Sequence, residues 1–520
     1  MRKLFFLAGK RGGAAIAVTA IAGLLFLSPL SSSLRLAISA NAQEAGAQGA
    51  PAGRAPRTTT LSPDRDLAMK IMAPFNFTGV GDIILRHPVA QLADTKFQGL
   101  IQNLRDADVA FANMEGTIID YNNLPEEGIR GGMPSSGIAD LKAMGIKIMN
   151  HANNHTMDSG VTGMFATNSM LLEAGIAQAG TGHNLEEARA PAFITTPKGR
   201  IALVGMFSQD PTSSPQPAST DAASYRQGDE GGVPGLNALR VSQTNIVTED
   251  QLEALRKIRD SVYARRNDAA YPYPMADIPA NEPKDRLELF GQSYKVGPKP
   301  GDISWTMNPQ DLREILRSIR NGKEYADFMV VTIHCHQNSH AFQKYTFDSD
   351  VPDFLVELAH KAIDNGADVF IGHGVHTLRG VEIYKGKPIF YGVSNFFNEL
   401  AQSSVPQAPG GDLTQAESAN LSANGDPFTT KDNLEALLTT SKYEGGKLTE
   451  VRIYPADLGR DLSRPLSRKG IPMTPSPEVA RQILEKVQTI SKPFGTTISI
   501  ENGVGVIHVA QTKPRHDEGN

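Results

Sequence analysis

Apolar segments with β-strand character alternate with amphipathic helical segments along most of this chain, and this alternation restricts the possible folds. Residues 75–82 and 107–116 predict strands, and a helical pattern fills 90–106 between them. A strand–helix–strand order recurs within 328–376. Strands joined in this way usually pair in parallel and are covered by the joining helices. We therefore predict an α/β fold with mixed sheets flanked by helices.

The first 42 residues have the composition of an export signal. Basic residues precede an apolar run from Ala14 to Leu30, and the small-residue pattern AISANA ends at Ala42. An uncleaved membrane anchor is the alternative, because the run approaches the length of a membrane span. We expect cleavage after Ala42 and a periplasmic or secreted mature protein.

Composition also suggests boundaries in the rest of the chain. Residues 43–68 are rich in Ala, Gly, Pro and Thr, which predicts a flexible linker. Residues 209–300 interrupt the alternation with many Pro, Gly and Ser, although 248–266 has helical spacing, so we predict a loop-rich insertion there. The remaining expected parts are a main domain at 69–400, a loop at 401–430 and a C-terminal part at 431–515 that completes the same domain.

Charge and cysteine content exclude several classes of protein. The net charge of −5 provides no basic surface for nucleic acid, so we expect no nucleic-acid partner. The single cysteine, Cys335, excludes an internal disulfide and any metal site built from several thiolates. Its position on a predicted strand between two histidines indicates that its side chain points away from theirs, into apolar packing.

Five predicted strands end in side chains that can bind metal ions. In open α/β sheets, ligands bind beyond the carboxyl ends of the strands, so these side chains are expected to converge. A single His or Asp in such a place is more often a packing or turn residue, but five coincidences are hard to attribute to chance. The ends carry Asp82, Glu115, the pair Asn154 and His155, the pair His334 and His336, and the pair His373 and His376.

Carboxylate, amide and imidazole groups together suit a hard or borderline divalent ion such as Mn, Zn, Fe or Mg. The candidate ligands outnumber those that one tetrahedral ion needs, so we predict two ions. In the segment IMNHANNHTMDSG, His155 is followed three residues later by Asp158, which could orient the imidazole for proton transfer to a leaving group. Asp158 could equally be the N-cap of the helix that follows, and the two roles are compatible.

Several motifs in this order resemble the CapA family of capsule synthesis proteins, which is associated with poly-γ-glutamate. The matching segments are GVGDIIL, ANMEG, NHANNHTMDSG, AGTGHNLEEA, VVTIHCHQN and IGHGVHTLRGVEIYKGKPIFYGVSNF. The resemblance implies a four-layer fold similar to calcineurin-type metallophosphatases. It also implies a general-acid role for His155 and metal ligation by Asp82, Glu115, Asn154, His334, His373 and His376.

The segment HCHQN departs from the His-Trp-Gly pattern of that family, with His336 where Gly is usual. His336 is expected to be an added ligand, a substrate contact or a strand residue that faces the core. Arg86 and Arg379 follow ligand positions closely and could pair with a phosphate or carboxylate of the substrate, although solvated surface charge is the alternative for each. Asn395 is expected to hydrogen-bond to the site or cap a turn.

The residues themselves indicate metal-assisted hydrolysis or transfer of an amide or phosphoester. The resemblance adds the substrate class, a polyanionic capsule polymer such as poly-γ-glutamate or a peptide, and a membrane-associated capsule synthesis complex as a partner. The alternative is a non-catalytic polymer-binding, export or anchoring component of such a complex. A scaffold of this kind would not need convergent metal ligands.

Overall fold

The computed structural model describes residues 66–509 except for short internal segments. The predicted export signal at 1–42 and the predicted loop at 401–430 lie outside the described residues, as does almost all of the predicted linker. In the described part of the chain, no helix is both long enough and apolar enough to span a membrane. The internal residues that are not described are 90, 121, 123–131, 211–221, 226–230, 267–280, 341–348, 400–430 and 461–463.

The first large sheet is built around β1 (Phe75–Ile84) and has the order β22-β23-β21-β20-β1-β2-β5-β6, with β19 also paired to β1. Strands β2, β5, β6 and β19 continue a parallel arrangement with β1, whereas β20 and the strands beyond it are antiparallel. The bounds are β2 Val109–Met114, β5 Ile146–Asn150, β6 Ala177–Ala179, β19 Asn395–Asn398, β20 Glu435–Glu444, β21 Lys447–Asp457, β22 Ser499–Glu501 and β23 Val504–His508.

The second large sheet has the order β12-β13-β11-β9-β15-β16-β18-β17, with β14 paired to β11 and β8 paired to β9. Its central strands β9, β15, β16 and β18 are parallel. The bounds are β8 Ala192–Thr196, β9 Gly199–Gln209, β11 Ala238–Val247, β12 Arg286–Leu289, β13 Gln292–Val296, β14 Ile303–Met307, β15 Phe328–His334, β16 Val369–His373, β17 Val381–Tyr384 and β18 Lys387–Phe390. Two small pairs are β3 Ile118–Ile119 with β4 Met133–Pro134, and β7 Thr181–Gly182 with β10 Gly235–Leu236.

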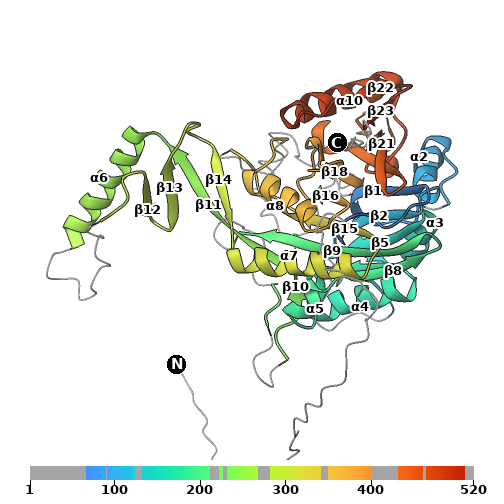
Figure 1. The fold of residues 1–520 in the computed structure, drawn as a ribbon, viewed down its shortest axis with the longest axis horizontal. Coiled ribbons are helices and arrows are strands. Elements are labelled where there is room, and N and C mark those ends of the chain that lie inside the picture. Colours follow the sequence, from blue (N-terminus) through green and yellow to red (C-terminus); the bar gives the residue numbers. More distant parts are fainter. Residues whose placement is uncertain are drawn as a thin grey trace, which may run out of the picture. The chain divides into compact units, whose positions relative to one another are not determined.

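The two sheets pack face to face and helices cover their outer faces (Figure 1). The core between the sheets contains Phe77 and Phe111 from the first sheet and Val330 and Ile371 from the second. Helices α2 to α4 pack on the first sheet, and α7 and α8 pack on the second. This four-layer order confirms the predicted α/β fold. The helices are α2 Thr95–Arg105, α3 Gly137–Ala143, α4 Gly160–Glu173, α5 Leu185–Arg189, α6 Glu249–Arg266, α7 Pro309–Glu324, α8 Asp353–Asp364 and α10 Pro477–Ser491.

Local sequence explains why these helices begin and which side they bury. The α7 helix follows Asn308, whose side chain accepts hydrogen bonds from the next two free backbone N–H groups, and Pro309 occupies the first turn, where no N–H is needed. Ile315 and Ile319, four residues apart, lie on one face of α7 and are fully buried against the second sheet. The helix thereby supports the sheet that carries the imidazoles of the candidate site.

The predicted insertion at 209–300 contains the expected helix, α6, and also strands that its composition did not indicate. The first residues of β11 pair with β9 of the second sheet, and its later residues pair with β13 and β14 (Figure 1). The β12–β13 hairpin and α6 share a small apolar cluster that includes Leu252, Leu287 and Leu289. The insertion therefore extends the second sheet rather than consisting only of loops.

Candidate metal centre

A row of polar side chains crosses the first sheet at the carboxyl ends of its parallel strands. Asp82 of β1 is in register with Asn113 of β2 and with Asn395 of β19, and Asn113 is in register with Asn150 of β5. The Asn113 amide donates to Asp82 Oδ1 (2.8 Å), and the Asn150 amide donates to Asn113 Oδ1 (2.8 Å). All four side chains are fully buried, and the Asn113 amide, itself held by Asn150, fixes the position of the carboxylate.

The close approach of β19 to β1 depends on a glycine. A Cβ atom at Gly81 would lie 1.7 Å from the Ser394 carbonyl oxygen, so a larger residue would separate the two strands. The backbone N–H of Asp82 donates to that same oxygen (3.3 Å). The Gly-Asp sequence therefore determines where the carboxylate of Asp82 stands in the sheet.

The second sheet supplies histidines from the ends of two neighbouring strands. His334 ends β15 and His373 ends β16, and the two residues are in register. The N–H of Gly374, directly after β16, donates to Asp82 Oδ2 (3.0 Å), which ties the two sheets together at this point. Because the ends of β1, β15 and β16 meet here, side chains far apart in sequence form one cluster.

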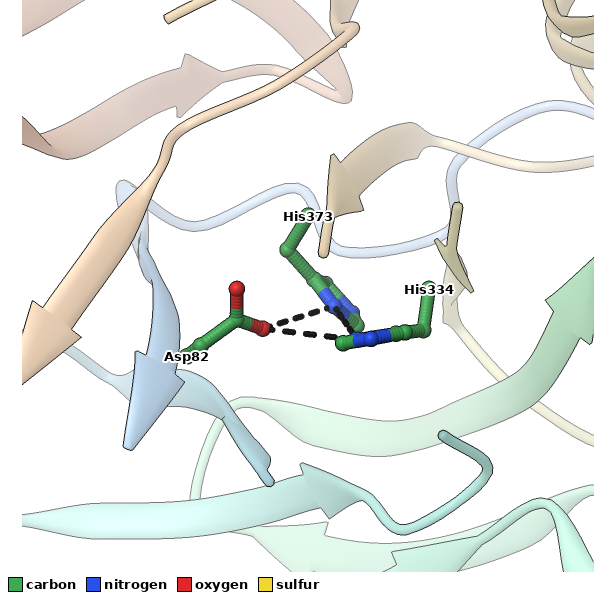
Figure 2. A group of neighbouring side chains, drawn as sticks. All are labelled: Asp82, His334 and His373. Carbon is green, nitrogen blue, oxygen red and sulfur yellow. Dashed lines mark hydrogen bonds and ion pairs between the residues drawn. The ribbon is translucent and has the colours of Figure 1, made fainter. Parts of the chain in front are cut away.

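Asp82, His334 and His373 form the first cluster, and their polar atoms point toward one another (Figure 2). Asp82 Oδ1 lies 3.1 Å from His373 Nδ1 and 3.5 Å from His334 Nδ1, and the two Nδ1 atoms are 3.1 Å apart. His373 Nε2 lies 3.0 Å from Thr332 Oγ1, which itself donates to the Ile371 carbonyl. The hydroxyl oxygen can therefore accept a hydrogen bond from the Nε2–H, which leaves the unprotonated Nδ1 facing Asp82.

Glu115, His336 and His376 form the second cluster, in which three ligand atoms lie within 4.8 Å of one another. His376 Nε2 is 3.6 Å from Glu115 Oε1. His376 Nδ1 is 2.7 Å from Asn395 Oδ1, so this oxygen can accept a hydrogen bond from the Nδ1–H and direct Nε2 toward Glu115. His336 Nε2 lies 3.0 Å from His334 Nε2, which brings the two clusters into contact.

The electrostatics of these residues fit bound cations. Among the described residues, no hydrogen-bond partner reaches either carboxylate oxygen of the buried Glu115. Burial and the negative charge of Asp82 raise the pKa of Glu115 well above its usual value, since a second buried carboxylate is unfavourable without a compensating charge. Burial lowers the pKa of His334 to about 4, so this imidazole is neutral near pH 7, as metal ligation requires. Carboxylates with neutral imidazoles are ligands for borderline divalent metals.

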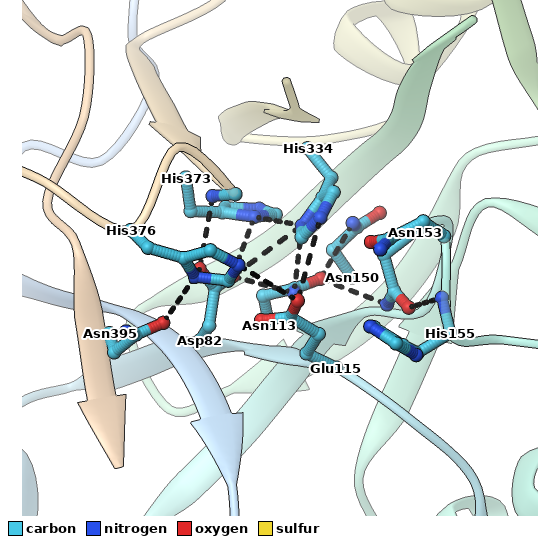
Figure 3. A network of polar contacts seen from close by, with 12 residues as sticks. Asp82, Asn113, Glu115, Asn150, Asn153, His155, His334, His373, His376 and Asn395 are labelled. Atoms are coloured by element: carbon cyan, nitrogen blue, oxygen red, sulfur yellow. Dashed lines mark hydrogen bonds and ion pairs between the residues drawn. The ribbon is translucent and has the colours of Figure 1, made fainter. Parts of the chain in front are cut away.

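The loop after β5 places a second set of predicted residues beside the clusters. Asn154 Oδ1 lies 3.3 Å from His336 Nε2. His155 Nδ1 lies 2.8 Å from Asp158 Oδ2, and their side chains are 44% and 23% exposed, so this pair faces solvent, whereas every cluster residue except the partly exposed His336 is buried. Figure 3 shows His155 at the edge of the polar network. The N-cap interpretation of Asp158 is wrong, because Ser159 is the residue that precedes the first turn of α4.

The model of the family described as "Bacterial capsule synthesis protein PGA_cap" matches residues 76–400, which include every residue of both clusters. The chain belongs to this family. Protein y4sH of Sinorhizobium fredii is 36% identical over 470 residues, covering 85% of this chain and 95% of the relative. The PGA biosynthesis protein CapA of Bacillus subtilis is 24% identical over 325 residues, which is 61% of each chain. The family model and the Bacillus subtilis relative confirm the predicted CapA resemblance.

Solved structures give a weaker likeness. A crystal structure of a phosphatase from Mycoplasma pneumoniae has 11% identity and a TM-score of 0.34, covering 76% of this chain and 98% of the other. A score at that level carries no argument about activity.

One of the two predicted substrate-contact arginines lies in the interior of the protein. The Arg379 side chain is only 1% exposed, so the interpretation as solvated surface charge is wrong. Its Nη2 donates to the Gln337 carbonyl (2.6 Å), and its Nη1 lies 3.9 Å from Cys335 Sγ, so the guanidinium holds the loop that carries His336. Arg86 is partly exposed, and its backbone N–H donates to the Glu399 carboxylate. Cys335 is buried among apolar residues, as predicted.

Some polar residues of the site were not predicted from the sequence. Asn113, Asn150 and Asn153 form an amide chain behind the ligands, in which the Asn153 amide donates to the Met114 carbonyl (2.6 Å) and its Oδ1 accepts from the His155 N–H (3.1 Å). His151 is fully buried, with Nδ1 2.7 Å from Asn168 Oδ1 and Nε2 3.2 Å from the Gly116 carbonyl. The sequence feature that could have indicated this chain is Asn113, a polar residue within the otherwise apolar strand segment FANM.

Proposed function

We propose that this chain is an exported, divalent-metal-dependent hydrolase or transferase that acts on an amide or phosphoester bond of an anionic capsule polymer. One observation carries the proposal. Two carboxylate–imidazole clusters touch at the carboxyl ends of two facing sheets, and a carboxylate-paired histidine lies next to them at the surface. A structural role alone does not account for Glu115, whose buried carboxylate has no hydrogen-bond donor among the described residues.

The donor set defines how ions would be held. Asp82, His334 and His373 would hold one ion, and Glu115 and His376, with Asn154 Oδ1 nearby, would be ligands of a second. Divalent ions in such sites polarise the scissile group and lower the pKa of bound water. The protein residues keep the ligand atoms converged and exclude bulk water from the buried side. Two divalent charges exceed the charge of two carboxylates, so the loaded site would attract a polyanion.

His155 is placed to move a proton. Its Nδ1 faces Asp158 Oδ2, which can accept a hydrogen bond from the Nδ1–H and hold the imidazole ring in one orientation. Nε2 is then the atom that would deliver a proton to the departing oxygen or nitrogen. The neighbouring Asn154 amide contacts His336, so the same short loop positions both the proton donor and one edge of the second cluster.

The substrate class comes from the relatives rather than from the geometry. CapA of Bacillus subtilis is named as a PGA biosynthesis protein and CapA of Bacillus anthracis as a capsule biosynthesis protein. By analogy, poly-γ-glutamate or a related polyanion, or a peptide, is the proposed substrate, handled within a membrane-associated capsule synthesis complex. The apolar N-terminal run and the AISANA pattern support export to the periplasm or beyond.

The experiment combines metal analysis with activity on two substrates. The mature protein is purified from the cell envelope, its N-terminus is identified, and bound metal is measured by ICP mass spectrometry. Activity is then assayed on bis(p-nitrophenyl) phosphate and on poly-γ-glutamate. We expect up to two ions per chain and turnover that a chelator abolishes. Folded protein that binds no metal and remains inert would refute the proposal and favour the non-catalytic polymer-binding, export or anchoring component.

Asp82→Asn is the variant that tests the first cluster within that experiment. Replacing the carboxylate by an amide keeps the size of the side chain but removes the charge that would balance a cation at the first cluster. We expect less bound metal and loss of turnover with a retained fold, measured by ICP mass spectrometry and circular dichroism. Full metal content in this variant would mean that the first cluster is not the binding site.

A further inference from the structure

We propose that His336 is a direct metal ligand that completes the second ion site and makes it selective for a transition-metal ion over Mg²⁺. The inference rests on the proposed function, because it presupposes that the clusters bind cations. It assigns a specific role to the residue at which this chain departs from the family pattern His-Trp-Gly.

The geometry of the chain after β15 turns His336 toward the clusters. Side chains alternate between faces along an extended segment, so His336 returns to the face of His334 while Cys335 points into the apolar core. The Cys335 N–H donates to the His373 carbonyl (2.8 Å), which continues the pairing of β15 with β16 past the end of the strand. As a result, His336 Nε2 lies 3.0 Å from His334 Nε2.

Buried contacts hold the backbone on both sides of His336. Arg379 donates to the Gln337 carbonyl (2.6 Å) from a position that is only 1% exposed. The Ser208 hydroxyl contacts both the His334 carbonyl (3.3 Å) and the Gln337 side chain. A surface histidine on an unsupported loop would lack these contacts. The loop is therefore preorganised to present an imidazole at a fixed position.

The ligand types in the second cluster explain why one added imidazole would change which metal ion the cluster prefers. Without His336, Glu115 would share the cluster with one imidazole, His376, and with the amide oxygen of Asn154 nearby. That oxygen-rich composition also suits Mg²⁺. With His336, two imidazoles and one carboxylate converge, which is a composition that favours Zn or Fe over Mg²⁺. The Glu115 carboxylate, which has no hydrogen-bond donor among the described residues, faces this group.

The test measures metal content and selectivity without using activity. Wild type and His336→Asn are dialysed against at least two equivalents of Zn²⁺ per chain in the presence of a large excess of Mg²⁺, and bound ions are counted by ICP mass spectrometry. We expect two Zn²⁺ per wild-type chain and about one in the variant, with affinity at the second site weakened by about 100-fold or more in calorimetry. The control is His183→Asn, because His183 also pairs with a carboxylate (2.7 Å to Glu187) but its side chain is 70% exposed.

A second variant shows ligation directly and protects the test against a folding defect. His336→Cys retains a donor atom, so Co²⁺ should produce a thiolate charge-transfer band that wild type, with the buried Cys335, does not show. The inference is overturned if His336→Asn keeps two Zn²⁺ with unchanged affinity while Asp82→Asn loses an ion, or if His336→Cys produces no such band. Wild type that binds no metal would instead refute the proposed function.

Discussion

Replacing His151 by Gln is expected to remove part of the acid sensitivity of the fold. Burial lowers the pKa of His151 from 6.5 to about 4, although its contacts with Asn168 and Gly116 favour the protonated form. Because the folded-state pKa lies below the unfolded-state value, the neutral imidazole contributes stability above pH 6.5, and this contribution is lost as the pH falls toward 4. Proton linkage gives a loss of about 2 kcal/mol between pH 7.5 and pH 5, and about 3 kcal/mol at pH 4.

Urea unfolding followed by circular dichroism at pH 7.5 and pH 5 measures this difference, with a chelator present so that metal binding does not contribute. With a urea m-value of about 3 kcal/mol/M or somewhat more, wild type should lose about 0.5 M more in its midpoint than His151→Gln. His155→Gln is the matched control, since its side chain lies in the same loop and is 44% exposed. Equal losses in wild type and His151→Gln would refute the reasoning.

Three further outcomes are expected. His155→Gln should keep its metal content and lose about 10²- to 10⁴-fold in kcat, checked on the same sample. Gly374→Ala should weaken metal binding by about tenfold or more in calorimetry, because the residue has φ of +97° and its new Cβ would lie 2.9 Å from His334 Nε2. Lys323→Met should lower the free energy of unfolding by about 3 kcal/mol in urea, because buried Asp368 would lose one of the two ion-pair partners that the structure describes and retain Lys387 (2.7 Å).

Much of the site could be predicted because its ligands follow apolar strands. Glu115, His334 and His373 all stand at or directly after the end of a buried strand, and the carboxyl ends of parallel strands meet at one edge of a sheet. The sequence alone did not reveal the register between strands. Register decides that His334 lies beside His373 and that Asp82 lies between Asn113 and Asn395.

Burial was the second property that local patterns could not reveal. His151 and His155 occur in the same short motif, yet the first is fully buried behind Gly116 and the second faces solvent beside Asp158. Arg379 could also be interpreted as a solvated surface charge, but its side chain is buried and donates to the Gln337 carbonyl. Each outcome depends on tertiary neighbours that are far away in the sequence.

The first sheet supplies the carboxylate of each cluster, from β1 for Asp82 and from directly after β2 for Glu115. The second sheet supplies all the imidazoles, from the ends of β15 and β16 or from the residues just after them. An ion held there would cross-link the two sheets at the edge where their strands end. Removing the metal would then weaken the contact between the sheets in addition to removing metal-dependent activity. Hydrogen exchange in β2 and β16 would report that loosening before any global unfolding.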